Sequence, residues 1–262
     1  GLPLVPIGHN ANIGWGITLA FIDLEDVVIE QFTDESCEKY LYKDEELDTE
    51  IITEEIKVKG KPIHKERVLI TKHGVIVSDV LQLDTQHLAL QSMALRPSKA
   101  LLGWLGINLA QDWDDFKNGV SYLESPGLNI AYADIDGNIG YYNSGKMPIK
   151  TKRQSSLPMR GWTGDGDWEK YVPFNEMPHV LNPKKGYVVT CNNKIMDDSF
   201  PHFLGDIYMN GFRAEQLEKI ITAKNKVGIS DFVTMQMNVT SIPGKALAQH
   251  FKEIVFKDER LN

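Results

Sequence analysis

One hairpin signal constrains the fold of this chain more than any other local pattern. Asp136-Gly137 stands between two runs of β character, residues 129–134 and 138–142. An Asp-Gly pair between such runs favours a tight antiparallel hairpin, because glycine readily adopts the left-handed backbone conformations of these turns. The centre of the chain is therefore expected to supply two adjacent strands of an antiparallel sheet.

Strands and helices are expected in separate stretches around this hairpin. Period-two alternation at 27–29, 54–58 and 68–70, broken by turn residues, predicts strands, and apolar residues at helical spacing follow Arg96-Pro97. We therefore expect one α+β domain over 1–262. Its four parts are β-rich 1–95, helical 97–122, hairpin and loops 128–192, and helical 205–253.

Composition narrows the classes of partner. The chain has 262 residues, 42% of them hydrophobic, which is enough apolar material for a sizeable core. No segment reaches the roughly 20 apolar residues of a membrane span. The formal charge of −8 disfavours attraction to nucleic acid or anionic lipid. A small molecule or another protein segment is the expected partner.

Two local patterns carry candidate chemistry. Gly14 and Gly16 bracket Trp15, and glycines in a strand permit close approach by a ligand or another backbone. A strand end with a packed tryptophan is the alternative. Asn192-Asn193 follows an apolar run, so it is either a simple turn or a strand-end pair whose side chains project into a cleft.

Taken in order along the chain, these segments resemble the penicillin acylase family of N-terminal-nucleophile amidohydrolases. The motifs that carry the resemblance are Gly8-His9-Asn10 with Trp15-Gly16, Tyr132-Ala133-Asp134 with Gly137 to Tyr141, Gly161-Trp162 with Trp168, and Asn182-Pro183 leading to Asn192-Asn193. The resemblance implies part of a four-layer αββα sandwich, in which antiparallel sheets are covered by helices. It also implies a bacterial parent enzyme that is secreted, periplasmic or attached to the cell envelope.

The activity implied by the resemblance is hydrolysis of N-acyl amides of the penicillin, cephalosporin or acyl-homoserine-lactone type. In that family an N-terminal Ser or Cys, freed by self-cleavage, attacks the amide and forms an acyl-enzyme. This nucleophile precedes Gly-His-Asn by several dozen residues, whereas Gly-His-Asn begins here at residue 8. We therefore expect an internal β-chain fragment that is inactive alone and needs the α-chain and the N-terminal β-chain segment.

Two other functions stay open. A non-catalytic binding module would use the same pocket without turnover. An assembly segment would need the α-chain to cover its apolar surface and would self-associate when alone.

The resemblance also assigns site residues. The backbone N–H of Leu19 and the side-chain amide of Asn192 would form an oxyanion hole, since two preorganised donors stabilise the charge that develops during amide hydrolysis. Arg213 would hold the site together, although a surface salt bridge is the alternative. The acyl pocket would fall on Ile7, Ile17, Trp104 and Leu128, residues that would also be ordinary core.

No cofactor is required by this chemistry, but a structural calcium ion is implied. Its ligands would be Asp23, Asp26, the carbonyl of Glu25, the loop near Ser155 and Asp206. Calcium takes six to eight oxygens, so two aspartates are too few alone. Surface acids without a bound ion are the alternative.

Overall fold

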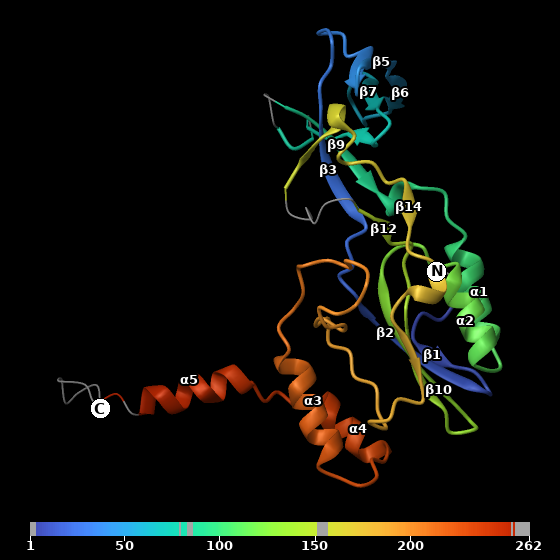
Figure 1. The fold of residues 1–262 in the computed structure, drawn as a ribbon, viewed down its shortest axis with the longest axis vertical. Helices are drawn as coiled ribbons and strands as arrows, with labels where there is room; N and C mark the ends of the chain where they lie inside the picture. The colour runs from blue at the N-terminus through green and yellow to red at the C-terminus, as the bar shows by residue number, and fades with distance from the viewer. Residues whose placement is uncertain (1–3, 79, 83–85, 151–156, 253, 255–262) are drawn as a thin grey trace.

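The computed structural model describes residues 4–78, 80–82, 86–150, 157–252 and 254. Its first sheet has the strand order β1-β2-β10-β11-β15, and all neighbours are antiparallel. These strands are β1 (Gly8–His9), β2 (Ile13–Leu19), β10 (Leu128–Asp134), β11 (Ile139–Asn143) and β15 (His179–Leu181). Strands β1, β2 and β10 of this sheet are labelled in Figure 1.

The predicted central hairpin is confirmed. Strands β10 and β11 pair from Asn129↔Asn143 to Ala133↔Ile139, and Gly137 in the connecting turn has a φ of 88°. The turn is held by the Asp134 carboxylate, whose Oδ1 accepts from the backbone N–H of Asn138 at 2.9 Å.

Strand β2 pairs with β10 on one side and with the much shorter strand β1 on the other. It pairs with β10 over its full length, from Ile13↔Asp134 to Leu19↔Leu128. The short strand β1 pairs only with Gly14 and Trp15 of β2. One edge of β2 therefore continues beyond β1 over residues 16–19.

Two helices cover one face of this sheet, as the sequence predicted for residues 97–122. They are α1 (Ala100–Leu109) and α2 (Trp113–Ser121). Asp112 caps α2 by accepting from the N–H of Asp115 at 2.9 Å. Ile107 of α1 and Phe116 of α2 are fully buried in one cluster with Ile130 and Tyr142 of the sheet. This cluster is the main core.

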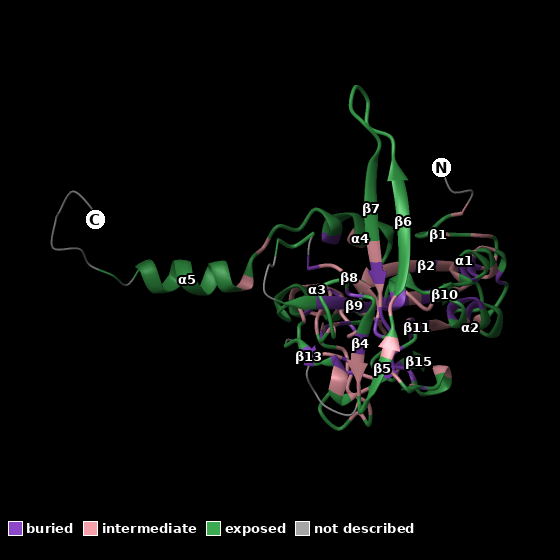
Figure 2. Cartoon of the chain, turned by 90° about the horizontal axis from the view of Figure 1, so that it is seen from above, coloured by how far each residue is buried: buried purple, intermediate pink, exposed green. Residues whose placement is uncertain are grey.

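The second sheet has the order β13-β3-β9-β8-β7-β6. Its strands are β13 (Met159–Arg160), β3 (Glu25–Glu30), β9 (His87–Ser92), β8 (Val75–Ile76), β7 (His64–Ile70) and β6 (Glu50–Ile56). Only β13 runs parallel to its neighbour. Strands β6 and β7 project from the body as an exposed two-stranded arm (Figure 2). A separate hairpin joins β4 (Lys39–Tyr42) to β5 (Glu45–Asp48).

The stretch expected as loop between 145 and 186 contains short elements. Besides β13 and β15 it holds a two-stranded sheet of β12 (Pro148–Ile149) and β14 (Lys170–Tyr171). Single 3-10 turns occur at Gly161–Thr163 and Phe174–Glu176, and another at Met93–Leu95. Each strand here is two or three residues long, so no sequence periodicity could develop.

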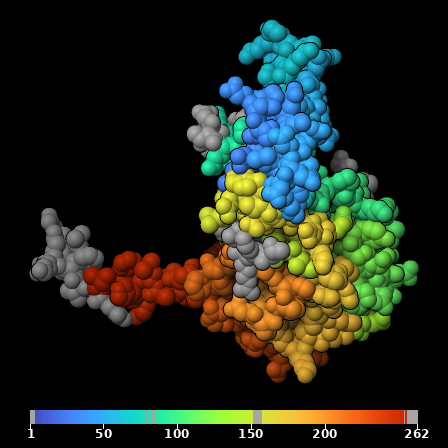
Figure 3. Space-filling view, turned by 45° about the horizontal axis from the view of Figure 1, so that its top comes forward, coloured from blue at the N-terminus to red at the C-terminus, as the bar shows by residue number. Residues whose placement is uncertain are grey.

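The C-terminal part is helical, but only from residue 212. Residues 205–211, expected to be helical, contain no helix. Helices α3 (Phe212–Thr222) and α4 (Ile229–Gln236) lie on the side of the first sheet opposite α1 and α2 (Figure 1). Helix α5 (Ile242–Lys252) has no buried residue and stands clear of the body in Figure 3. Among the described residues, no helix is long and apolar enough to cross a membrane.

Candidate active site

The direction of the Leu19 backbone follows from the register of β2 and β10. The N–H of Ala20 donates to the Gly127 carbonyl at 3.0 Å, so the backbone N–H of residue 20 points towards the β10 side of β2. In an antiparallel pair, alternate residues direct their backbone groups to opposite sides. Leu128, opposite Leu19, accordingly bonds to Ser144 on its other side. The N–H of Leu19 therefore points to the edge of β2 that extends beyond β1.

Asn192 lies at this same edge of β2. Its Nδ2 atom donates to the Leu19 carbonyl at 2.8 Å, although the two residues are 173 positions apart in the sequence. Asn192 has a φ of 64°, a left-handed conformation that asparagine tolerates better than most residues. The structure thus brings together the two predicted oxyanion donors.

Arg213, near the start of α3, binds the other end of the Asn192 amide. One guanidinium nitrogen, Nη2, donates to Asn192 Oδ1 at 2.8 Å and to the Cys191 carbonyl at 2.6 Å. An amide oxygen accepts and an amide nitrogen donates. Arg213 therefore requires the oxygen of Asn192 on its own side and directs the NH₂ group towards Leu19.

Two hydroxyls and a thiol lie near these donors. Thr18 Oγ1 and Thr190 Oγ1 are 2.8 Å apart and share a hydrogen bond that joins β2 to the segment before Asn192. The Cys191 side chain is buried, and burial raises the pKa of its thiol above the usual value. A thiol of raised pKa is a poor nucleophile at neutral pH, because the thiolate is the reactive form.

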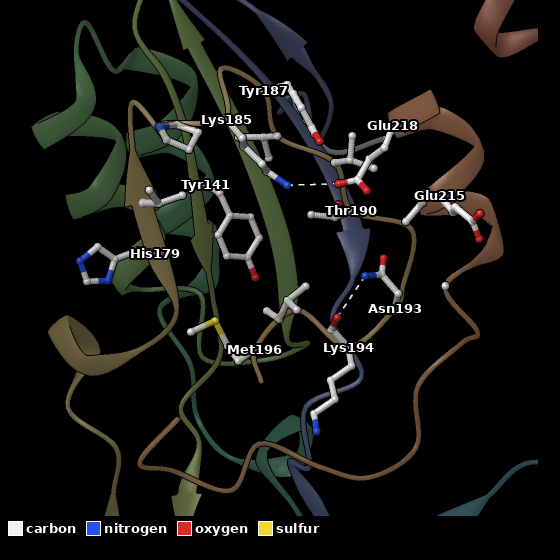
Figure 4. Close-up of a pocket in the computed structure, with 17 residues that line it drawn as sticks. Tyr141, His179, Lys185, Tyr187, Thr190, Asn193, Lys194, Met196, Glu215 and Glu218 are labelled. Carbon is white, nitrogen blue, oxygen red and sulfur yellow. Dashed lines mark hydrogen bonds and ion pairs between the residues drawn. The ribbon is translucent and has the colours of Figure 1, made fainter. Parts of the chain in front are cut away.

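Two cavities flank this region. One, of about 480 Å³, is lined by Leu19, Phe21, Asp23 and Asp206 among others. The other, of about 500 Å³, lies between the first sheet and α3 and is shown in Figure 4. In the second cavity Asn193, and not Asn192, is a wall residue, and Lys185 pairs with Glu218 at 3.2 Å across one end.

The four residues predicted to line the acyl pocket have different environments. Leu128 belongs to the main core, and Ile17 and Trp104 pack against that core. Ile7, by contrast, is 59% exposed. None of the four lines the cavity of Figure 4.

The predicted metal-binding aspartates contact a lysine. Lys150 Nζ lies 2.5 Å from Asp23 Oδ2 and 3.0 Å from Asp26 Oδ1. The second oxygen of Asp26 accepts from the indole N–H of Trp168 at 2.7 Å. Burial raises the pKa of Asp23 above its usual value, and the hydrogen bond and charge of Lys150 oppose this effect.

The other predicted calcium ligands lie around this pair. Glu25 was predicted to bind through its backbone carbonyl; its carboxylate accepts from Ser92 Oγ at 2.7 Å and is exposed. Asp206 is close enough to repel the charge of Asp23 and is exposed as well. Ser155 lies outside the described residues. Among the described residues, no three His, Cys, Asp or Glu side chains form a group that could hold a metal ion.

A second buried polar cluster was not predicted from the sequence. His73 lies with Nδ1 2.7 Å from Glu30 Oε1 and Nε2 3.1 Å from Asp167 Oδ1, and all three side chains are almost fully buried. Tyr42 and Lys72 also donate to Asp167. His73-Gly74 looks like a turn in the sequence, and no spacing links it to Glu30 or Asp167.

Comparison with known proteins points to one family. Residues 1–261 match the sequence profile described as penicillin amidase. A penicillin G acylase of Escherichia coli is 31% identical over 75% of this chain. Penicillin acylase 2 proenzyme of Pseudomonas sp. (strain SE83) and the acyl-homoserine lactone acylase QuiP of Pseudomonas aeruginosa are each 25% identical over 92%.

The fold agrees with this match. A thermostable penicillin G acylase from Alcaligenes faecalis superimposes with a TM-score of 0.80 over 98% of this chain, at 24% identity. The expected fold class is thereby confirmed. The chain spans 23% of the length of the Escherichia coli penicillin G acylase, 31% of penicillin acylase 2 proenzyme, 30% of QuiP and 47% of the solved chain.

Proposed function

The chain belongs to the penicillin amidase family, and from this we propose that it supplies the oxyanion-binding part of an acylase that hydrolyses N-acyl amide bonds. The observation that carries the proposal is the hydrogen bond between the side chain of Asn192 and the backbone of Leu19. The Asn192 amide donates to the Leu19 carbonyl on the open edge of β2, the side to which the Leu19 N–H also points.

These two groups suit a developing oxyanion. An amide NH₂ donates twice, so donation to Leu19 leaves Asn192 a second N–H for an incoming oxygen. The backbone N–H of Leu19 supplies another donor without any requirement on its side chain. Donors fixed before the reaction stabilise the tetrahedral intermediate of acyl transfer, because they need not reorganise as charge develops.

The attacking group, in this proposal, is an N-terminal Ser or Cys on a segment outside residues 1–262. Nearby side chains are poorly suited to the role. Thr18 and Thr190 share their hydroxyl hydrogen bond, and burial raises the pKa of the Cys191 thiol. The 262-residue chain alone is therefore expected to show no turnover.

The substrate class follows from the relatives and from the predicted pocket. The relatives are named as acylases of penicillins and of acyl-homoserine lactones. In the predicted acyl pocket Ile17 and Leu128 would supply aliphatic side chains, and in this structure they pack against or within the main core. An apolar slot favours burial of an apolar acyl group. We expect alkyl or bulky aliphatic acyl groups to be preferred over strictly aromatic ones.

Further segments of the acylase are the proposed protein partners. Four leucines of α1 are 45–67% exposed although leucine favours burial, namely Leu101, Leu102, Leu105 and Leu109. A contiguous apolar face of this kind marks an interaction surface. In this proposal the α-chain or the rest of the β-chain covers it, and the chain alone self-associates. Light scattering of the chain with and without those segments measures this.

The central experiment compares two proteins on a panel of chromogenic N-acyl amides. One is the 262-residue chain, and the other is extended upstream through the expected Ser or Cys and expressed with the α-chain. Turnover by the extended protein only, lowered about 100- to 1,000-fold in kcat by Asn192→Ala, is the expected result. The exposed Asn225 provides a matched control, since Asn225→Ala should leave kcat unchanged.

Two results would contradict the proposal. Turnover by the short chain would mean that one of its own residues attacks the amide. Full kcat in the Asn192→Ala variant of the extended protein would remove Asn192 from the oxyanion site.

A further inference from the structure

A lysine ammonium lies between two buried carboxylates next to the candidate active site. The side chains of Lys150, Asp23 and Asp26 are 6%, 9% and 2% exposed, respectively. Charged side chains are rarely buried to this extent unless they are paired. Lys150 contacts both aspartates, at 2.5 Å and 3.0 Å, so a single cation serves the pair.

We propose that Lys150 is the built-in cation of this site, and that its ammonium occupies the position between Asp23 and Asp26 in place of a divalent metal ion. The calcium expected from the family resemblance is then not bound by this chain. The positive charge is supplied by the chain itself, so its retention does not depend on the free calcium concentration.

The donor atoms around the pair support this assignment. Calcium takes six to eight oxygen ligands at 2.3–2.6 Å. Here Asp26 Oδ2 already accepts from the indole N–H of Trp168, and an indole N–H can only donate. An ammonium needs only a few acceptors, and Lys150 donates to Asp26 Oδ1 and forms an ion pair with Asp23 Oδ2.

Charge leads to the same conclusion. Lys150 already neutralises one of the two carboxylate charges, so less negative charge is left to attract a divalent ion. A calcium ion added beside Lys150 would be repelled by an ammonium within a few ångströms, in surroundings where water screens charge weakly. Calcium and the lysine therefore compete for one position.

The contacts also suggest a structural role for the lysine. Lys150 directly follows β12, Asp26 lies in β3, and Asp23 lies four residues after Leu19. The N–H of Asp23 in turn donates to the Leu204 carbonyl at 2.7 Å. Lys150 therefore links the segment that follows the oxyanion strand and strand β3 of the second sheet to the end of β12.

The test uses terbium luminescence and thermal unfolding of the 262-residue chain. Tb³⁺ takes the same oxygen ligands as Ca²⁺, and Trp168, bonded to Asp26, would sensitise its emission. For the unmodified chain we expect background emission and the same Tm in excess EDTA as in millimolar CaCl₂. For Lys150→Ala we expect a lower Tm, Tb³⁺ emission that Ca²⁺ displaces, and a Tm raised by at least about 2 °C in CaCl₂.

Two further variants assign the signal. Lys146→Ala removes a neighbouring lysine that pairs with Glu124 at 3.1 Å on the surface, and it should behave like the unmodified chain. Lys150→Ala combined with Asp26→Asn should lose the emission gained by Lys150→Ala.

The proposal is overturned if the unmodified chain gives Ca²⁺-displaceable emission that Asp26→Asn abolishes, or if EDTA lowers its Tm. It is also overturned if Lys150→Ala has the Tm of the unmodified chain, because the pair would then need no cation. If Lys150→Ala does not fold, the measurements on the unmodified chain still decide whether a divalent ion binds.

Discussion

The guanidinium of Arg213 fixes which end of the Asn192 amide faces Leu19. It donates to Asn192 Oδ1 at 2.8 Å, while Asn192 Nδ2 donates to the Leu19 carbonyl at 2.8 Å. Arg213 also donates to the Cys191 carbonyl, so side chain and backbone of the turn are held together. The structure places Arg213 against the Asn192 amide, and its organising role in catalysis stays a prediction.

Arg213→Ala should therefore act through Asn192 in the active acylase that contains this chain. We expect kcat to fall about 10- to 100-fold with little change in KM, because a misplaced donor weakens the transition state more than the bound substrate. The double variant with Asn192→Ala should be no slower than Asn192→Ala alone. Additive losses would show that Arg213 acts elsewhere. Arg67→Ala, in the exposed arm, is the control.

Gly119 allows α1 and α2 to pack closely. A Cβ atom at this position would lie 2.8 Å from the Ile107 backbone nitrogen, which cannot move aside without moving α1. Gly119→Ala should lower the free energy of unfolding by about 1–2 kcal/mol, although alanine favours the helix itself. Urea unfolding measures the change. Gly211→Ala, where the added Cβ meets open space, should stay within about 0.5 kcal/mol of the unmodified chain.

The buried cluster around Asp167 should make stability depend on acid pH. Burial alone would raise the pKa of Asp167, but hydrogen bonds from Tyr42, Lys72 and His73 bring this pKa below its usual value. A carboxylate whose pKa is lower in the folded state stabilises the fold above its unfolded pKa, about 3.9, and this contribution is lost as pH falls through the folded pKa.

Asp167→Asn tests this dependence. At pH 7 it should lower Tm by about 3–10 °C, since hydrogen bonds to a charged, buried group are lost. The difference from the unmodified chain should narrow below about pH 4. A difference that stays constant from pH 7 to pH 3 would contradict the assignment. Asp114→Asn, whose side chain is 82% exposed, is the control and should change Tm little.

Leu19 should tolerate changes of side chain and not of backbone. Leu19→Ala keeps the N–H, and its side chain is 43% exposed, so kcat of the acylase should change less than about threefold. Leu19→Pro removes the N–H and should lower kcat about 100-fold or more. Circular dichroism separates this loss from unfolding. Equal kcat values in the two variants would exclude the backbone donor.

The elements that sequence predicted best are those whose signal is local. Asp136-Gly137 marked its hairpin, and the helical spacing after Arg96-Pro97 marked the region of α1 and α2. The short strands between 145 and 186 were missed because each is defined by a distant partner, as when Met159 pairs with Val28.

The residues of the candidate site also differ in whether the sequence could predict them. Leu19, Asn192 and Arg213 were predicted through the family resemblance, and the structure places Asn192 in contact with each of the other two. Lys150 was missed because a lysine in an irregular segment resembles any surface lysine. Only the folded chain shows that its ammonium reaches Asp23 and Asp26.

The backbone direction at Leu19 has a consequence for genetic approaches to this protein. A main-chain N–H is kept when its residue is replaced by alanine, so an alanine scan across the gene would not detect this donor. Random mutagenesis would reach it only through rare proline substitutions, which would be scored as folding defects. Backbone chemistry, such as replacement of the peptide bond after Thr18 by an ester, removes this donor atom and leaves the Leu19 side chain intact.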